Sequence, residues 1–109
     1  MKDSLKYNLL KTLADNPALS QRQLAKELGI SLGKANYCLR SLIETGLVKA
    51  KNFHRSHSKT RYLYILTPHG LEKKAEVTAR FLKKRLQEYE TLKKEIEELR
   101  AEVNKDSEE

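Results

Sequence analysis

The chain has 109 residues, of which 39% are hydrophobic and 34% charged, and its formal net charge is +7. This length predicts one small domain with an appendage, and so small a core favours a partner that buries further surface. No segment approaches the roughly 18 apolar residues of a membrane span, and charges interrupt the N-terminus where a signal peptide is apolar. A single cysteine excludes an internal disulfide, so we expect a reducing cytoplasm.

The positive charge is concentrated in the first part of the chain. Residues 1–70 contain 12 lysines and arginines against 4 acidic residues, whereas residues 71–109 contain 10 against 11. A basic excess confined to one part of a chain is typical of nucleic-acid binding. A basic domain without such a partner is the alternative.

The first predicted helix covers residues 3–15. Leu5, Leu9 and Leu13 recur every four residues, which predicts one buried face, and either Asp3 or Ser4 can cap the start. The helix should end where a proline follows at residue 17.

The segment from Ser20 to Val48 predicts a helix-turn-helix. Ser20 and Gln23 have the spacing of a capping box, and Gly29 supplies the left-handed residue that ends a short helix. Ser31 should cap a second, longer helix. The apolar residues of that helix, which we expect to be buried, are Ala35, Leu39, Leu42 and Ile43.

The polar face of the second helix predicts contact with DNA. We expect Asn36 to bind adenine and Arg40 to bind guanine or phosphate, while backbone N–H groups near the helix start face phosphate. Two amphipathic helices joined at a glycine are often only a packing unit, which is the alternative. The candidate DNA-binding residues of this segment are Ser31, Gly33, Lys34, Asn36, Tyr37, Arg40 and Ser41.

The hydrophobic period changes to two after residue 47. We expect strands at residues 47–51 and 61–67, joined by a polar, basic tip at residues 53–59. A β-hairpin directly after such a helix is the wing of a winged helix, and its cations would follow the DNA backbone or the minor groove. A solvated polar loop is the alternative. The wing cations are Lys49, Lys51, Arg55, Lys59 and Arg61.

A long helix should begin at Thr67 and Pro68 and continue to about Asn104, before a disordered acidic tail at residues 106–109. Its heptads carry glutamates at g and basic residues at the following e positions, with one polar interruption, Arg85 at d. The pattern predicts a parallel homodimer; an antiparallel pair and packing within one chain remain open. The predicted dimer contacts are Leu82, Tyr89, Leu92, Ile96, Leu99 and Val103.

The chemistry of an enzyme is not apparent in the sequence. We find no glycine-rich phosphate loop after a strand and no hydrolase or metalloprotease motif. His54, His57 and His69, together with Cys38, match no zinc-ligand spacing. We therefore expect no catalysis, no metal and no cofactor.

Two segments resemble a known family. GKANYCLRSLIETG at residues 33–46 and LTPHGLEKK at residues 66–74 resemble the short winged-helix regulators of the MarR type that occur with exopolysaccharide gene clusters in bacteria. The resemblance implies a DNA-binding transcriptional regulator, with recognition-helix contacts at Gly33, Lys34, Asn36, Tyr37 and Arg40 and wing contacts at Arg55 and Lys59. Larger MarR-type proteins dimerise through helices at both ends, around an effector pocket. This chain has a short first helix and one long last helix, so a comparable pocket is not expected.

The sequence as a whole predicts a mainly α (α+β) protein. Residues 1–70 would form a winged helix-turn-helix that binds double-stranded DNA, and residues 71–105 a coiled-coil dimerisation helix. The remaining functional alternatives are a protein-interaction module built on the coiled coil and a winged helix that binds RNA.

Overall fold

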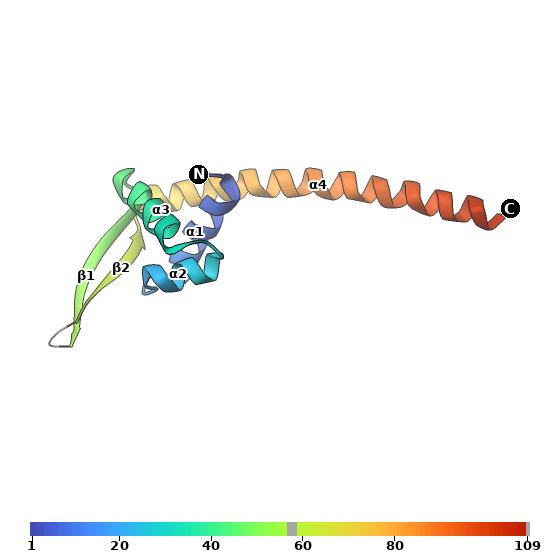
Figure 1. The fold of residues 1–109 in the computed structure, drawn as a ribbon. Coiled ribbons are helices and arrows are strands. Elements are labelled where there is room, and N and C mark those ends of the chain that lie inside the picture. The colour runs from blue at the N-terminus through green and yellow to red at the C-terminus, as the bar shows by residue number, and fades with distance from the viewer. Residues whose placement is uncertain (57–58, 109) are drawn as a thin grey trace.

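A computed structural model describes the backbone of residues 1–56 and 59–108 and the side chains of residues 1–52 and 62–107. Three short helices precede a β-hairpin and one long helix (Figure 1), which is the predicted winged helix. The elements are α1 (Asp3–Asp15), α2 (Gln21–Leu28), α3 (Leu32–Glu44), β1 (Val48–Ser56), β2 (Lys59–Leu66) and α4 (Pro68–Glu108).

One apolar core joins the three short helices to the base of the hairpin. Leu9 of α1, Leu24 of α2 and Leu39 of α3 are all fully or almost fully buried in it. The predicted stripe of α3 is confirmed except at Ile43, which is 36% exposed. Ile43 lies at the edge of the helix face that Ala35, Leu39 and Leu42 define, so the apolar pattern alone assigned it wrongly.

The predicted ends of α2 and α3 are confirmed. Ser20 and Gln23 form the capping box, and Gly29 adopts the left-handed conformation with φ 66°. The Ser31 hydroxyl accepts a hydrogen bond from the backbone N–H of Lys34, at 3.1 Å. The start of α1 differs from the prediction, because its N-cap is Lys2 and no side chain caps it.

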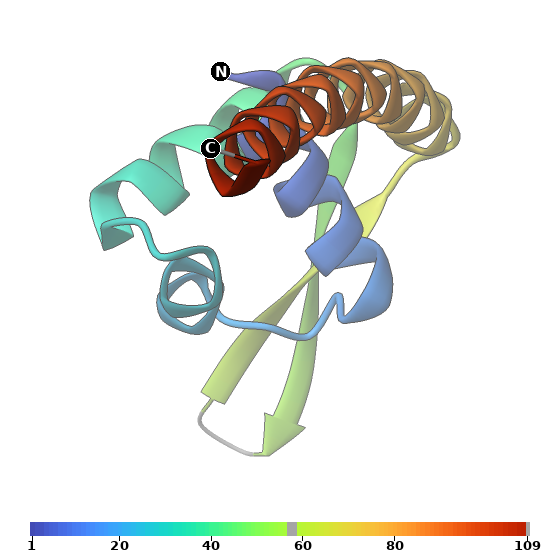
Figure 2. The same ribbon diagram turned by 90° about the vertical axis from the view of Figure 1, so that its right-hand side faces the viewer.

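The hairpin is longer than predicted. Its strands are antiparallel and extend through much of the expected tip, with an irregular register between His54 and Ser56. Val48 and Tyr64 are buried against the helices, so the base of the hairpin belongs to the core. The end of the hairpin that is farther from the helices projects away from the helical body, toward the bottom of the view in Figure 2.

Helix α4 packs on the domain only near its start. Val77 is fully buried and Phe81 is half-buried, whereas every described side chain after Phe81 is exposed. The exposed part extends away from the domain as a stalk (Figure 1), in a molecule that measures 78 × 26 × 20 Å. The helix continues to Glu108, past its predicted end at about Asn104 and through most of the segment expected to be disordered. No helix among the described residues is long and apolar enough to cross a membrane.

Aromatic and charged contacts fix α1 to α4. The rings of Tyr7 and Phe81 stack with centroids 4.9 Å apart, and the Arg85 guanidinium lies over Phe81 at 4.9 Å. Arg80 pairs with Asp3, the residue expected to cap α1, at 3.3 Å. Arg85 also binds Glu88 in the same helix at 2.9 Å. The polar residue that interrupts the heptad pattern therefore contacts the aromatic pair next to the domain.

Candidate nucleic-acid interface

The second helix of the helix-turn-helix, α3, presents one continuous face to solvent. Gly33, Tyr37, Arg40 and Glu44 follow one another at steps of three and four residues, and all four are exposed. Tyr37, near the middle of the helix, is 74% exposed. Because Glu44 repels phosphate, we expect nucleic acid to contact the N-terminal and central turns of α3 rather than its end.

The opposite face of α3 holds the helix rigidly. Ala35, Cys38, Leu39 and Leu42 are buried against the core, which determines the side of the helix that faces solvent. A reading surface on a firmly packed helix places its side chains reproducibly. Among the predicted contacts, Lys34 is exposed, while Asn36 and Ser41 are half-buried at the borders of the outward face.

Two wing cations lie on the face of the hairpin that points away from the core. Side chains along a strand point alternately to its two faces. Val48 and Tyr64 point to the buried face, so Lys49 and Lys51, with their partners Ile65 and Leu63, point to the other face. Both lysine side chains are exposed. The backbones of Arg55, Lys59 and Arg61 belong to the strands, but their side chains lie outside the described residues, so their predicted contacts stay predictions.

A chain of hydrogen bonds links the wing to α3 through α2. Asn36 Nδ2 donates to Gln21 Oε1 at 2.8 Å, and Gln21 Nε2 donates to the Tyr64 hydroxyl at 3.1 Å. Tyr64 is only 6% exposed, and its backbone N–H donates to the Pro17 carbonyl at 3.0 Å. The Asn36 amide is therefore tied to a well-packed part of the domain.

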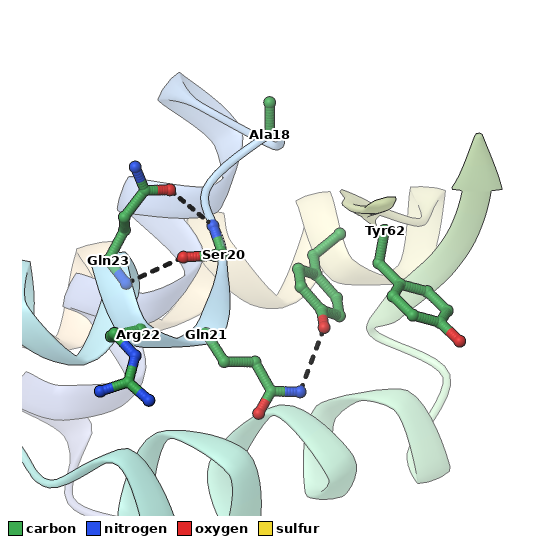
Figure 3. Close-up of a pocket in the computed structure, with 7 residues that line it drawn as sticks. Ala18, Ser20, Gln21, Arg22, Gln23 and Tyr62 are labelled. Carbon is green, nitrogen blue, oxygen red and sulfur yellow. Dashed lines mark hydrogen bonds between the residues drawn. The ribbon is translucent and has the colours of Figure 1, made fainter. Parts of the chain in front are cut away.

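A shallow groove opens between the start of α2 and strand β2 (Figure 3). Gln21 reaches across it to the Tyr64 hydroxyl, and the Tyr62 and Tyr64 rings lie 6.4 Å apart. The Arg22 side chain is exposed beside the groove. The residues that line it are Ala18, Ser20, Gln21, Arg22, Gln23, Tyr62 and Tyr64.

Sequence reasoning missed Gln21, Arg22 and Tyr62 as neighbours of the predicted interface. Gln21 is 15 positions from Asn36 and 43 from Tyr64, so no local spacing signals the contacts. The packing of α2 against α3 and the hydrogen bond from Gln21 to Tyr64 of β2 bring these side chains together.

No group of histidine, cysteine or acidic side chains that could hold a metal ion occurs in the part of the chain that the structure describes. Cys38 is buried in the α3 face that packs on the core. Among the described residues, no buried side-chain nitrogen or oxygen lacks a hydrogen-bond partner.

Residues 2–49 match a protein family described as winged helix-turn-helix DNA-binding. The domain is a winged helix-turn-helix. The match covers the three short helices and the first residues of the wing, and the hairpin and α4 complete the fold beyond it.

Several solved structures share this winged-helix fold. The PcaV transcriptional regulator from Streptomyces coelicolor superposes with a TM-score of 0.62 and 23% identity over 72% of this chain and 54% of that one. MepR, a transcription regulator of the Staphylococcus aureus multidrug efflux pump MepA, superposes with a TM-score of 0.62 and 21% identity, over 93% of this chain and 74% of the MepR chain. Streptococcus pneumoniae FabT, solved in complex with DNA, superposes with a TM-score of 0.54 and 23% identity, over 76% of this chain and 56% of the FabT chain.

The expected resemblance to MarR-type regulators is thus confirmed for the fold, since S. aureus MarR itself superposes with a TM-score of 0.55. The chain spans 54–57% of the length of the PcaV structures it matches, so much of those proteins has no counterpart in it. Among curated protein sequences, none matches the chain.

Proposed function

We propose that this winged helix-turn-helix is a transcriptional regulator of the MarR type that binds double-stranded DNA in a sequence-specific manner. The observation that carries the proposal is the outward face of α3, where Lys34, Tyr37 and Arg40 are exposed on a helix packed firmly on its other side. Donor and aromatic side chains on such a helix suit the major groove, which admits an α-helix and displays a distinct pattern for each base pair.

The surroundings of α3 support the same function. Lys49 and Lys51 extend the positive charge onto the wing, where cations bind phosphates without regard to sequence. The matched family is described as DNA-binding, and FabT, which shares the fold, was solved in complex with DNA. PcaV and MepR, with the same fold, are transcriptional regulators.

We propose further that the regulator is a homodimer joined by α4. An exposed row of large apolar side chains follows the heptad positions of the stalk, with exposures between 41% for Ile96 and 63% for Val103. No other described element of the chain covers the stalk after Phe81. A second copy would bury this row in a parallel coiled coil. The residues of the row are Leu82, Tyr89, Leu92, Ile96, Leu99 and Val103.

Charge on the stalk favours the parallel arrangement. Glu95 at g would face Arg100 of the second copy at the following e position, and Glu88 would face Lys93 in the same way. Glu88 binds Arg85 within its own chain, so the Glu95 pair is the one we expect to contribute to pairing. Exposed pairs of this kind select a partner more than they add stability.

Selection of bound sequences from a random duplex-DNA library tests the proposal. A two-fold dimer should select a pseudo-palindrome whose half-sites lie about one helical turn, ~10 base pairs, or a multiple of it apart. Competition of the selected duplex against structured RNA then separates this function from RNA binding. A library that shows no enrichment, or RNA that displaces the duplex at equal concentration, would contradict the proposal.

We also propose which genes the regulator controls and in which compartment it acts. That the regulator controls exopolysaccharide genes rests on the sequence resemblance alone, and deletion of the gene followed by transcript measurement tests it. A DNA-binding protein of a bacterium acts in the cytoplasm, which is where we place this one.

A further inference from the structure

We infer that Gln21 is a positioning residue for sequence reading: it holds the amide of Asn36 in one orientation, so that Asn36 selects adenine. The inference rests on the proposed function and adds to it a residue outside α3. Asn36 Nδ2 donates to Gln21 Oε1 at 2.8 Å, and the Gln21 side chain is itself held at its other end by Tyr64.

The bond to Gln21 decides which atoms of Asn36 remain free. With Nδ2 turned toward α2, the second N–H of that nitrogen and the Oδ1 oxygen are available at the border of the outward face. A free donor beside a free acceptor is the pair that an asparagine needs to bind N7 and the N6 amino group of adenine together. A freely rotating amide would offer this pair in two opposite orientations.

Tyr64 holds the Gln21 side chain at the end opposite to Asn36. The hydroxyl accepts from Gln21 Nε2 at 3.1 Å, while the ring is buried at the base of the wing. Because this ring is buried, its hydroxyl has a well-defined position, and Gln21 bridges that hydroxyl and Asn36 (Figure 3 shows its contact with the hydroxyl). Fixing the amide before DNA arrives also lowers the conformational entropy lost on binding.

The experiment uses the full chain and the duplex obtained by selection, with each base pair replaced in turn. The wild type should prefer adenine at one position of each half-site by about tenfold, the scale of one bidentate contact. Gln21→Leu removes both hydrogen bonds at similar volume and should reduce that preference to about threefold or less, while other positions keep theirs. Tyr64→Phe should have a smaller effect at the same position.

Three further variants separate positioning from a structural role. In an Asn36→Ala background, Gln21→Leu should cause no further loss at the adenine position, because its effect passes through Asn36. Gln23→Leu, the matched control in the same helix, breaks the capping box and should lower the melting temperature without altering base preference. Gln21→Glu keeps an acceptor for Asn36 but loses the Nε2 donor, so the Tyr64 hydroxyl would instead donate to the new carboxylate. This variant should preserve the adenine preference even though its charge weakens binding to all sequences.

Each result has a definite meaning. Unchanged adenine preference in Gln21→Leu, or an equal loss on every sequence, would overturn the inference and leave the proposed function standing. If Gln21→Leu does not fold, Gln21→Glu decides, and loss of its adenine preference would also overturn the inference. A wild type without base preference at any position would overturn both.

Discussion

Gly70, in the first turn of α4, offers the sharpest test of how the stalk is attached to the domain. A Cβ added at Gly70 would lie 2.0 Å from the carbonyl oxygen of Leu47 and 3.0 Å from its carbonyl carbon. Real Cβ atoms essentially never come within 3.0 Å of such an atom, so Gly70→Ala must separate two backbone segments by about 1 Å.

The expected cost follows from what that separation disturbs. The Leu47 carbonyl accepts from the Thr67 N–H at 3.0 Å, and the Thr67 hydroxyl donates to the Gly46 carbonyl. Overpacking costs about 1–3 kcal/mol, and each weakened hydrogen bond adds about 1 kcal/mol. We therefore expect Gly70→Ala to lower the free energy of unfolding by about 3–5 kcal/mol, which corresponds to a fall in Tm of at least ~10 °C.

Two other glycines provide matched controls for the same substitution. Gly33 lies inside α3, its added Cβ meets nothing within 4 Å, and Gly33→Ala should stabilise the protein by up to about 1 kcal/mol. A Cβ added at Gly46 would also meet no atom within 4 Å, but the residue has a φ of +75°, which is unfavourable for alanine. Gly46→Ala should therefore lower the free energy of unfolding by about 1–2 kcal/mol. Urea and thermal unfolding at one protein concentration measure all three. A Gly70 variant as stable as the wild type, or more stable than the Gly46 variant, would refute the packing argument.

Three further predictions concern DNA and the dimer. Asn36→Ala should cost about 1–3 kcal/mol at one base pair, measured by binding to single-base variants of the selected duplex; an equal loss on all of them would show that Asn36 reads no base. Arg40→Ala should reduce the slope of log K against log salt by about 1 if Arg40 binds phosphate, or relax specificity if it binds guanine. Lys94→Ala on the stalk removes the same charge and should do neither. The double variant Ile96→Asp with Leu99→Asp should have the mass of a monomer in light scattering. The control Thr91→Asp with Lys94→Asp, outside the apolar row, should keep the mass of a dimer. An unchanged mass for the Ile96 and Leu99 variant would reject the coiled coil.

Local sequence rules predicted the elements that depend on local interactions. The capping box at Ser20, the left-handed Gly29 and the cap at Ser31 involve residues a few positions apart, and all three occur as expected. The prediction was wrong for the cap of α1, because the helix begins at Asp3 itself and its N-cap position falls on Lys2, whose side chain makes no capping bond; Asp3 pairs instead with Arg80, which is distant in the sequence.

Contacts between distant segments were beyond the reach of the sequence pattern. The Asn36–Gln21–Tyr64 hydrogen bonds depend on how α2 packs against α3 and how close its first residue comes to Tyr64 of β2, and neither spacing nor hydrophobic period encodes that. Arg85 is a different case, because its contacts lie within α4 itself, and its place at heptad position d predicted a polar interruption of the coiled coil. Its guanidinium lies over the Phe81 ring, where α4 leaves the domain, and also pairs with Glu88.

The hydrogen bonds of Thr67 affect the spacing between DNA half-sites that a dimer would accept. Thr67 bonds through its backbone to Leu47 and through its hydroxyl to Gly46, two residues that follow the C-cap of α3. The start of α4 is therefore joined to the residues that follow the proposed reading helix by two direct hydrogen bonds. In a coiled-coil dimer, the distance and angle between the two α3 helices would then be set by the stalk, and half-site spacing would be strict. Because Gly70→Ala loosens this same joint, any folded fraction of that variant should tolerate changes of spacing that the wild type rejects.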